Sequence, residues 1–471
     1  MMERKSRLSA FFKQCVITTA ALLNNVVHGS GLAYAAVLLP QLRHSSIRLG
    51  EEQESWLASI IPLAMCAGNV LTVPAMRRGR RATHLLVSLL NIAGWLTITL
   101  ACNFQVLMIG RFLQGMSIGL FIPVVSVYLG EYTSPSHRGV FLATISFGQA
   151  LGTLFGHSVG SFLAWQDMAL LCSGLSLISF AITVFTPESP SWLALEGRFG
   201  ECRKAFRWLR GDNEEEELNK MIQERQHFDS SDDYSTSILE ALQAMTKREI
   251  YIPLAIGVAM YVIIVNCGSL ILANYVNEIV EELMGPSNVV AWMCVFDGVR
   301  LASNLASLYI VARVQRRTLL FSTGIACVFV HIALSAYIYA QLSGIVDGSW
   351  IPALILICQI VTIGLGVQSI CFMILGEIFP LQYRGLCSSV CGLMMGLMFV
   401  ELKTFPALRG GVGLGGAWLV YGAAVGLALM VTWPLLPETR GRTLQDIEGH
   451  FRKTLRKGPE AEAMNTVTST K

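Results

Sequence analysis

Charged residues are scarce in this sequence. Only 14% of its 471 residues are Asp, Glu, Lys or Arg, and 53% are hydrophobic, whereas an average soluble domain has about 25% charged residues. The charges are clustered, so the stretches between them run for about 20 residues almost without charge, which is long enough to cross a bilayer as a helix. Backbone polar groups in lipid must be satisfied within the span. This composition excludes a soluble globular protein.

Several chemical motifs are also missing. The sequence has no paired CxxC pattern of the kind that binds zinc, and most of its twelve cysteines lie in apolar runs, where a free thiol acts as a small hydrophobe. It has no GxxxxGK[ST] loop, which argues against an ATP-driven pump. We therefore expect no catalytic residues, no enzymatic activity, no metal and no cofactor. The expected partners are the lipid bilayer and a small-molecule solute, with no nucleic acid, and the protein is expected to be a monomer.

Long apolar runs predict an all-α integral membrane protein with about twelve transmembrane helices. The predicted spans are 14–39, 56–76, 83–102, 106–129, 140–164, 167–186, 252–279, 289–311, 318–341, 350–376, 385–407 and 414–436. We expect an N-terminal six-helix bundle at 1–187, a cytoplasmic linker at 188–248, a C-terminal six-helix bundle at 249–436 and a cytoplasmic tail at 437–471. Within the linker, residues 201–209 have the pattern of a short amphipathic helix, and the rest is expected to be a plain connection.

Basic residues gather in the loops on one side of the predicted membrane. These loops contain Arg77, Arg78, Arg80, Arg81, Arg138, Arg313, Arg316, Arg317 and Arg384. The opposite loops carry mainly acids: Glu51, Glu52, Glu54, Glu281, Glu282 and Asp347. Because cytoplasmic loops are enriched in Lys and Arg, we expect a multi-pass protein with both termini and the linker in the cytoplasm.

The two halves of the chain repeat each other. The matching features are Arg80-Arg81 and Arg316-Arg317, Glu131 with Arg138 and Glu377 with Arg384, and the closing corners Pro187-Glu188 and Pro437-Glu438. Glu131 and Arg138 are seven residues apart, as are Glu377 and Arg384. Internal repeats of this kind are typical of transporters, whose substrate sites lie between the repeats. The sequence thus predicts two pseudo-symmetric bundles around a central cavity.

These residues carry a family resemblance. The chain resembles the sugar porters of the major facilitator superfamily, nearest the insect facilitated trehalose transporter-like branch, over about residues 16–450. The matching motifs are Arg111-Phe-Leu-Gln-Gly115, Tyr128-Leu-Gly-Glu131, Pro187-Glu-Ser-Pro190, Gly376-Glu-Ile-Phe-Pro380 and Pro437-Glu-Thr-Arg-Gly441. The resemblance implies a transporter of the plasma membrane that works by rocking two bundles around a fixed site, giving alternating access.

The charged residues of these motifs suggest a gate. The candidate gating residues are Arg80, Arg111, Glu131, Arg138, Glu188, Arg316, Glu377, Arg384 and Glu438. We expect them to lie at one level near the cytoplasmic ends of the helices and to pair across the two bundles when that side is closed. Exposed pairs of about 0–1 kcal/mol each would suit a gate that opens thermally. Positive-inside anchoring with helix capping is the alternative, and for Arg77 and Arg78 it is the preferred interpretation.

The presumed substrate cavity departs from the family pattern. Sugar porters typically have a Gln-Gln-x-Ser-Gly-x-Asn run in the seventh span, where this chain keeps Gly268 and has Asn266 but no glutamine. The prolines of the tenth span are absent, and Phe372 stands where a tryptophan is expected. Met394 replaces the expected Asn of the eleventh span, and Ser146 replaces a Gln in the fifth. The candidate substrate-binding residues are Ser146, Gln149, Asn266, Gly268, Phe372 and Met394.

A few polar groups fall inside the predicted spans, where charges are costly and usually functional. They are His28, Asp297, Arg300, Glu401 and Lys403. Asp297 and Arg300 are three residues apart on one helix face, as a structural ion pair or a functional one. His28 is expected to face the cavity with Asn24 and Asn25, as a hydrogen-bonded spacer or a proton relay. The first span has no Asp or Glu, which favours facilitated diffusion over proton symport.

We therefore expect facilitated diffusion of a sugar or sugar-like solute. The lost amides leave two alternatives: a transporter of a non-sugar small organic solute, and a non-transporting sensor or receptor that retains the fold. Solute uptake into vesicles would separate the transporters from the sensor, and a ligand panel would separate the two transporters.

Overall fold

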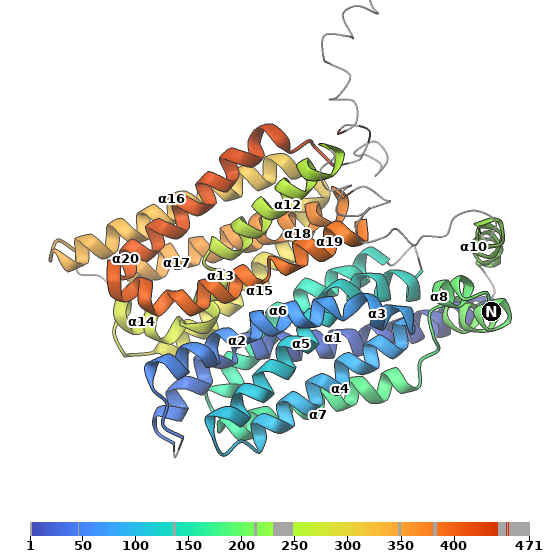
Figure 1. Ribbon diagram of the computed structural model, residues 1–471, viewed down its shortest axis with the longest axis horizontal. Helices are drawn as coiled ribbons and strands as arrows, with labels where there is room; N and C mark the ends of the chain where they lie inside the picture. The colour runs from blue at the N-terminus through green and yellow to red at the C-terminus, as the bar shows by residue number, and fades with distance from the viewer. Residues whose placement is uncertain are drawn as a thin grey trace, which may run out of the picture. The chain divides into compact units, whose positions relative to one another are not determined.

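The computed structural model describes residues 2–45, 47–134, 138–211, 214–228, 248–346, 350–379 and 384–440, with 449 and 451. The first half of the chain contains α1 (Met2–Arg43), α2 (Glu51–Val70), α3 (Thr72–Arg77), α4 (Arg80–Thr99), α5 (Phe104–Tyr132), α6 (Arg138–Gly160) and α7 (Trp165–Val184) (Figure 1). Helices α8 (Pro190–Leu195), α9 (Phe199–Arg210) and α10 (Glu215–Phe228) follow. Five of the six predicted spans of this half each coincide with one helix, and the second, 56–76, coincides with α2 and α3. Apolar runs are expected to form helices because they must satisfy their own backbone in lipid.

The second half contains α12 (Arg248–Asn266), α13 (Ser269–Asn274), α14 (Val276–Met284), α15 (Val289–Arg313) and α16 (Arg316–Leu342). They are followed by α17 (Trp350–Thr362), the π-helical turn η1 (Ile363–Val367), α18 (Gln368–Glu377), α19 (Arg384–Leu393) and α20 (Gly396–Leu435). Nine helical stretches within the described ranges are long and apolar enough to cross a membrane. This helix order is that of the twelve-helix, two-bundle fold that the sequence predicts.

Four of the predicted spans are interrupted. The second breaks at Leu71 into α2 and α3, and the eleventh breaks at Met394 and Met395 into α19 and α20. The seventh breaks at Gly268 into α12, α13 and α14. The tenth contains the turn η1, directly before residues 368–372, where the prolines typical of the family are absent. The helix α20 covers the last predicted span and part of the one before it, and its backbone kinks at Gly413, where φ is 73°. Glycines and π-turns are common causes of such breaks.

The helices of the first half pack closely because small residues face their neighbours. A Cβ atom added at Gly119 of α5 would lie 2.0 Å from the carbonyl oxygen of Met65 on α2. One added at Gly152 of α6 would lie 2.1 Å from the carbonyl oxygen of Val26 on α1. Small residues allow this close approach of helix backbones within membranes. The helix pairs α1–α6 and α2–α5 are therefore fixed by their glycines.

The stretch after α7 is more structured than the sequence suggested. The expected amphipathic helix at 201–209 is part of α9, but α8 and α10 were not expected. The three helices share a small core of Leu193, Ala194, Cys202, Ala205, Phe206, Leu218 and Ile222. At the end of α9, Gln14 Nε2 donates to the carbonyl oxygen of Leu209 at 3.3 Å, and Arg210 Nη2 donates to that of Thr133 at 3.0 Å. The helices are thus attached to the N-terminal part of α1 and to the C-terminal end of α5.

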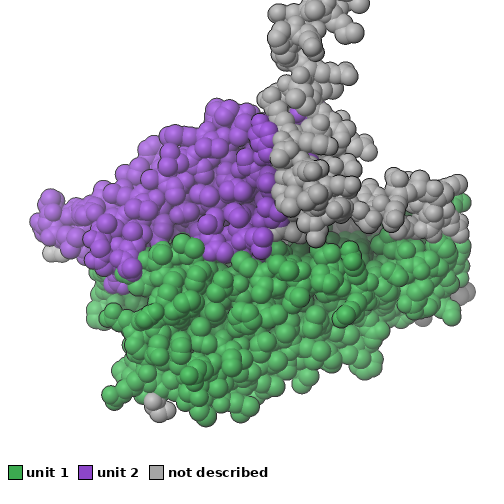
Figure 2. Space-filling model, in the orientation of Figure 1, with its two compact units in different colours: residues 1–234, 270–304, 398–406 green, residues 235–269, 305–397, 407–471 purple. Residues whose placement is uncertain are grey.

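Two compact units divide the chain (Figure 2). Unit 1 comprises residues 1–234, 270–304 and 398–406, and unit 2 comprises 235–269, 305–397 and 407–471. Unit 1 therefore contains two segments of the second half of the sequence as well as the first half. The domain boundaries expected at 187/188 and 248/249 remain predictions.

Candidate functional site

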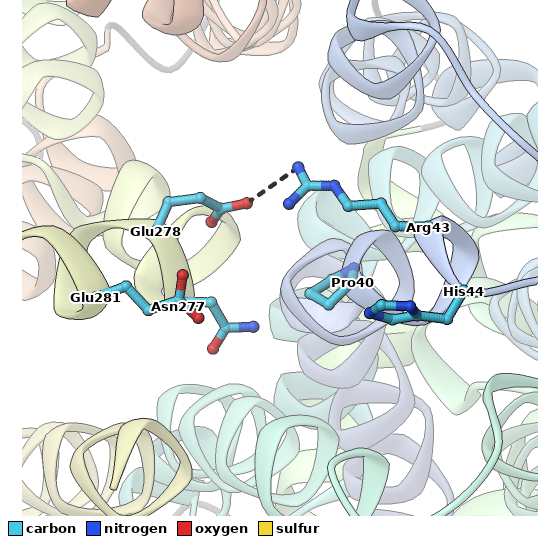
Figure 3. A pocket seen from close by; sticks show the side chains of 6 residues that line it. All are labelled: Pro40, Arg43, His44, Asn277, Glu278 and Glu281. Atoms are coloured by element: carbon cyan, nitrogen blue, oxygen red, sulfur yellow. Dashed lines mark ion pairs between the residues drawn. The ribbon is translucent and has the colours of Figure 1, made fainter. Parts of the chain in front are cut away.

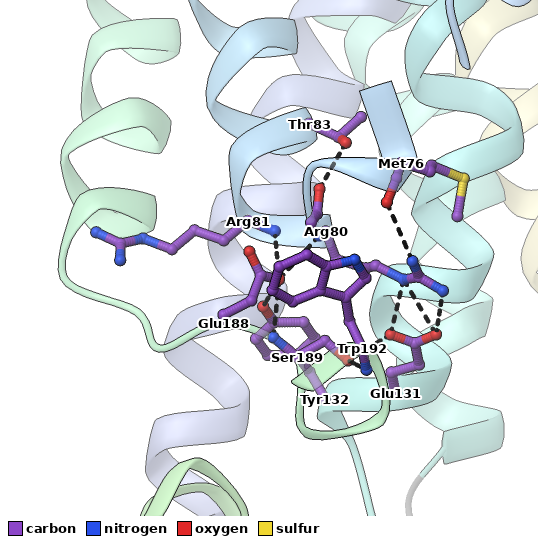
Figure 4. Close-up of polar contacts among 10 residues, drawn as sticks. Met76, Arg80, Arg81, Thr83, Glu131, Tyr132, Glu188, Ser189 and Trp192 are labelled. Atoms are coloured by element: carbon purple, nitrogen blue, oxygen red, sulfur yellow. Dashed lines mark hydrogen bonds and ion pairs between the residues drawn. The ribbon is translucent and has the colours of Figure 1, made fainter. Parts of the chain in front are cut away.

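The first charge cluster lies in unit 1 and consists of Arg80, Arg81, Glu131, Glu188 and Ser189 (Figure 4). Glu188 Oε1 accepts hydrogen bonds from the backbone N–H groups of Arg80 at 2.8 Å and Arg81 at 2.9 Å. The Arg80 guanidinium forms an ion pair with Glu131, with Nη2 and Oε1 3.1 Å apart. The hydroxyl of Ser189 donates to the same carboxylate. Glu188 thus caps the first turn of α4, where backbone donors lack a partner within the helix.

Gly79 directly precedes this cluster, and the cluster leaves room only for glycine at this position. Its φ angle of 117° lies in a region that side-chain-bearing residues rarely adopt. A Cβ atom there would also lie 2.3 Å from Oε2 of Glu188. The turn before α4 therefore requires glycine for both its backbone angle and the space that the capping carboxylate takes.

The second charge cluster lies in unit 2 and consists of Arg316, Arg317, Glu377, Glu438 and Thr439. Glu438 Oε1 accepts from the backbone N–H of Arg316 at 3.1 Å, and its Oε2 accepts from that of Arg317 at 3.0 Å. The Arg316 guanidinium forms an ion pair with Glu377 and donates to Thr439 Oγ1 at 3.3 Å. The duplicated sequence features therefore make the same contacts: arginine to glutamate, and a second glutamate on a helix N-terminus.

These residues pair within each half of the sequence, and their pairing across the bundles when the cytoplasmic side is closed remains a prediction. Arg80 pairs with Glu131 in the first half, and Arg316 pairs with Glu377 in the second. The reason is local, because the capping glutamates hold each arginine at the start of its own helix, beside the nearest acidic helix end. The side chains of Arg138 and Arg384 lie outside the described part, so their role in the gate remains a prediction.

The expectation that Arg111 lies at the same level as Glu131 was wrong. Arg111 and Glu131 are both on α5, 20 residues apart, which corresponds to about 30 Å along a helix. The Arg111 side chain is fully buried, and its Nη1 donates to the carbonyl oxygen of Gly31 at 2.6 Å. Its Nε donates to that of Leu57 at 3.4 Å. Arg111 therefore joins α5 to α1 and α2 inside unit 1, far from the first charge cluster.

The polar side chains of the first span point toward the other helices of unit 1. His28 Nε2 lies 3.0 Å from Ser117 Oγ, and its ring packs edge-on against Phe121. Asn24 Nδ2 donates to Ser88 Oγ at 2.8 Å. Asn25 donates to the carbonyl oxygen of Ile145. These bonds to α4, α5 and α6 support the interpretation of His28 as a hydrogen-bonded spacer.

A buried charge cluster, His157, Asp297 and Arg300, joins the two halves of the sequence inside unit 1. The expected pair of Asp297 and Arg300 is present, with Oδ1 and Nη1 3.3 Å apart. The other carboxylate oxygen, Oδ2, lies 2.5 Å from Nδ1 of His157 on α6. The side chains of His157 and Asp297 are only 1% and 2% exposed. His157 Nε2 lies 3.1 Å from the carbonyl oxygen of Ala273.

His157 was not among the predicted functional residues. Its signal was a histidine in an otherwise uncharged fifth span, 140–164, three residues before the end of α6. Periodicity could not show that this end meets the start of α15, because that contact joins residues 140 positions apart.

More contacts between the two halves of the sequence lie around Arg43, the last residue of α1. We call this end of the protein the Arg43 end. Gln41 Nε2 donates to the carbonyl oxygen of Gly160, which places the end of α6 here as well. Arg43 binds Glu54 of α2 through two hydrogen bonds of 2.7 and 3.0 Å, and its Nη2 lies 3.8 Å from Glu278 Oε1 of α14. Figure 3 shows the pocket beside this pair. Its lining residues are Pro40, Arg43, His44, Asn277, Glu278 and Glu281.

The two charged residues expected in the eleventh span have different surroundings. The ammonium group of Lys403 lies 4.4 Å from the ring centre of Trp56 on α2, as a cation–π contact. Ser55 of α2 donates to the carbonyl oxygen of Lys403 at 3.3 Å. Glu401 is buried, and neither of its carboxylate oxygens has a hydrogen-bond partner among the described residues. Lys403 thus belongs to the contacts of the Arg43 end.

Gly268 marks a polar centre in unit 2. Its φ angle is 84°, and a Cβ atom there would lie 2.5 Å from both Gln359 Nε2 and the ring of Trp418. Gln359 Nε2 donates to the carbonyl oxygen of Cys267 at 3.0 Å, and the Trp418 ring packs edge-on against His331. This close packing explains why the glycine is present where the rest of the family's seventh-span pattern is lost.

The remaining candidate substrate residues are spread over both units. Ser146 and Gln149 lie on α6 in unit 1, and Ser146 is exposed. In unit 2, Asn266 donates to the carbonyl oxygen of Val262 in its own helix, and Phe372 is 37% exposed. Met394 lies at the break between α19 and α20. Their grouping in one substrate site remains a prediction.

Comparison with known proteins gives the chain its family. The family model described as "Sugar (and other) transporter" matches residues 18–451. The facilitated trehalose transporter Tret1 of Apis mellifera ligustica is 27% identical over 453 residues, covering 94% of this chain and 89% of that protein. Tret1 of Drosophila yakuba is 29% identical over 445 residues, covering 92% of this chain and 51% of that protein.

Solved structures share the fold. The proton:xylose symporter XylE bound to 6-bromo-6-deoxy-D-glucose has a TM-score of 0.76 at 18% identity, over 93% of this chain and 99% of that one. The inward-open conformation of the xylose transporter XylE from E. coli has a TM-score of 0.75, also at 18% identity and over the same shares of both chains. With its apolar helices and duplicated charge clusters, this chain is a membrane transporter rather than an enzyme. The chain belongs to the sugar transporter family of the major facilitator superfamily.

Proposed function

We propose that this transporter carries a sugar of the trehalose type down its concentration gradient. The observation that carries the proposal is its similarity to facilitated trehalose transporters, at 27% identity over 94% of the chain. The absence of Asp and Glu between residues 10 and 43 supports facilitated diffusion, because the first helix offers no carboxylate to couple a proton.

The two ends of the protein would take different parts in alternating access. Opening the Arg43 end requires contacts between the two halves of the sequence to break, among them Arg43–Glu278 and His157–Asp297. The charge clusters each hold residues of one half, so they would move as rigid pieces with their own bundles. This division fits a rocking motion of two repeats about a fixed site.

The orientation follows from the basic loops. With the arginines of the two charge clusters in the cytoplasm, both termini and residues 188–248 also lie there, in a multi-pass protein of the plasma membrane, and the Arg43 end faces outward. Epitope tags placed after residue 1, at residue 230 and after residue 471 should bind antibody only in permeabilised cells. Binding to the tag at 230 in intact cells would overturn this topology.

The candidate substrate residues are Ser146, Gln149, Asn266, Gly268, Phe372 and Met394. With sulfur and apolar groups where sugar porters typically have amides, we expect Phe372 to provide the main stacking surface. Phe372→Ala should weaken trehalose binding by about 0.5–1.5 kcal/mol, which is what an aromatic contact contributes beyond its buried area. Radiolabel competition on the purified protein would measure this loss.

Uptake of radiolabelled trehalose into liposomes containing the purified protein tests the function. We expect uptake to exceed that of protein-free liposomes and to stop when the internal and external concentrations are equal. Unlabelled trehalose loaded inside should accelerate entry of the label by exchange. Accumulation above equilibrium driven by a proton gradient would contradict facilitated diffusion, and absence of uptake with trehalose and glucose alike would contradict sugar transport.

A further inference from the structure

Glu401 of α20 is a buried carboxylate whose hydrogen-bonding capacity the protein leaves unused. The residue is 5% exposed, and neither carboxylate oxygen has a hydrogen-bond partner within the described part of the chain. A carboxylate is acceptor-only, with about four lone-pair sites on its two oxygens. Burying such a group without partners is costly, and charges inside membrane spans usually serve a function. Glu401 is therefore a candidate for binding a ligand that brings its own donors.

The donors on the elements around Glu401 are committed to other acceptors. Tyr275, which joins α13 to α14, donates its hydroxyl to the carbonyl oxygen of Leu402 at 3.3 Å. Ser55 of α2 donates to the carbonyl oxygen of Lys403 at 3.3 Å. The ammonium group of Lys403 lies over an aromatic ring of α2, and residues two apart on a helix do not face each other. These groups hold the backbone of α20 in place and leave the carboxylate without a donor.

Aromatic side chains lie beside the carboxylate. Phe405 follows Glu401 by four residues, so both lie on one face of α20. The Phe405 ring centre lies 4.9 Å from that of Tyr275. Sites for small molecules are mostly apolar and aromatic, with a few polar groups placed among them. This part of α20 has that composition.

We propose that Glu401 is a solute-binding residue, whose carboxylate accepts hydrogen bonds from adjacent hydroxyl groups of a neutral polyol. The inference rests on the proposed function in taking a sugar as the solute. Adjacent hydroxyls on a sugar ring can each donate to one oxygen of the same carboxylate. Hydrogen bonds from a hydroxyl to a carboxylate are charge-assisted, and they are about twice as strong as bonds between neutral groups. Glu401 would thus supply part of the polar recognition that the missing amides of the family pattern no longer give.

The solute would reach Glu401 from the Arg43 end. Glu401 lies two residues before Lys403, whose contacts with α2 belong to that end. While the end is closed and empty, the unpartnered carboxylate lowers the stability of the protein. Hydroxyl donors of a bound solute remove this cost. The same side chain therefore reduces stability without solute and increases affinity for solute.

Stability and binding measured on the same variants separate a solute-binding carboxylate from a structural one. Glu401→Met puts an apolar chain of similar length in its place, and Glu401→Gln keeps one acceptor oxygen in a nearly identical shape. Glu52→Gln, at an exposed acid in the first turn of α2, is the matched control. Each protein is purified in detergent, and its thermal unfolding midpoint is measured without solute. Binding is then measured with radiolabelled trehalose, glucose and myo-inositol, and with glucosamine, which carries an ammonium group.

We expect Glu401→Met to raise the unfolding midpoint of the solute-free protein by about 1–3 °C, because it removes a buried charge that has no partner. It should weaken trehalose binding about tenfold to a hundredfold, through the loss of charge-assisted hydrogen bonds. Glu401→Gln should weaken binding less, since one oxygen still accepts. Glu52→Gln should keep the wild-type midpoint and the wild-type affinity.

Four results would overturn the assignment. The first is unchanged polyol binding in Glu401→Met. The second is a lower unfolding midpoint in both Glu401 variants, because the carboxylate would then already have partners within the protein. The third is Glu401-dependent binding of glucosamine alone, which would assign a cationic solute. The fourth is that none of the three polyols binds the wild-type protein.

This experiment also separates the two proposals. Trehalose uptake that persists in Glu401→Met with unchanged affinity would remove the role of Glu401 and leave trehalose transport standing. Binding of glucose or myo-inositol through Glu401, with no binding of trehalose, would contradict trehalose as the solute and support the carboxylate as a polyol site.

Discussion

The two charge clusters make the same contacts on different turns. In the first, Glu188 accepts both backbone N–H groups on Oε1, and its other oxygen lies against Gly79. In the second, Glu438 uses one oxygen for each N–H, and the residue before the helix is Gln315 with an ordinary φ of −64°. The cap in the second cluster therefore forms without a glycine, because the Glu438 carboxylate is turned so that each oxygen accepts one N–H. What the two halves keep in common is the capped arginine pair, and the turn before it can differ.

The largest loss of unfolding free energy that separates the two clusters is expected at Gly79. Gly79→Ala should destabilise the protein by about 2–4 kcal/mol, of which about 1–3 come from a backbone conformation that is essentially restricted to glycine and about 1 from displacing the Glu188 cap. Denaturant unfolding in detergent micelles would measure the loss. Gln315→Ala is the matched control and should stay within about 0.5 kcal/mol of the wild type. Equal losses at the two positions would mean that the turns do not differ as described.

The residues of the clusters could be predicted from the sequence, and their pairing could not. Their types and spacing repeat in the two halves, so Arg80, Glu131 and Glu188 were found with Arg316, Glu377 and Glu438. Which arginine meets which glutamate depends on how the capping glutamates place the helix starts, and this is a tertiary property. Charge and repetition alone suggested contacts across the halves.

The spans, likewise, could be predicted from the sequence, and their breaks could not. Hydrophobic length located the spans, because lipid imposes that length on a helix. The break at Gly268 and the turn η1 depend on what packs against the helix, such as Trp418 and Gln359 around Gly268. The partnership of His157 with Asp297 likewise depends on a contact between distant spans. The predicted position of Arg111 was wrong because 20 residues of α5, about 30 Å of helix, separate it from Glu131.

The capping glutamates should respond unequally to a neutral replacement. Glu438→Gln should cost about 1–3 kcal/mol, because one of its two accepting oxygens becomes an amide N–H₂ facing a backbone N–H. Glu188→Gln should cost less, about 0.5–1 kcal/mol, since a single carbonyl oxygen can still accept from Arg80 and Arg81. Unfolding in detergent of both variants beside the wild type would give the order. A larger loss for Glu188→Gln would contradict the two geometries.

The smallest effect is expected from the ion pairs themselves. The side chains of Arg80 and Glu131 are 13% and 17% exposed, and those of Arg316 and Glu377 are 19% and 24% exposed. A double-mutant cycle with Arg→Ala and Glu→Gln should give a coupling of up to about 1 kcal/mol for each pair, in the range of exposed pairs. The more buried first pair should give the larger value. A cycle on Arg80 and Glu377, which belong to different halves, is the control and should give no coupling, because each residue has its partner in its own half. Coupling there as strong as within the halves would restore the gate across the two bundles that the sequence first suggested.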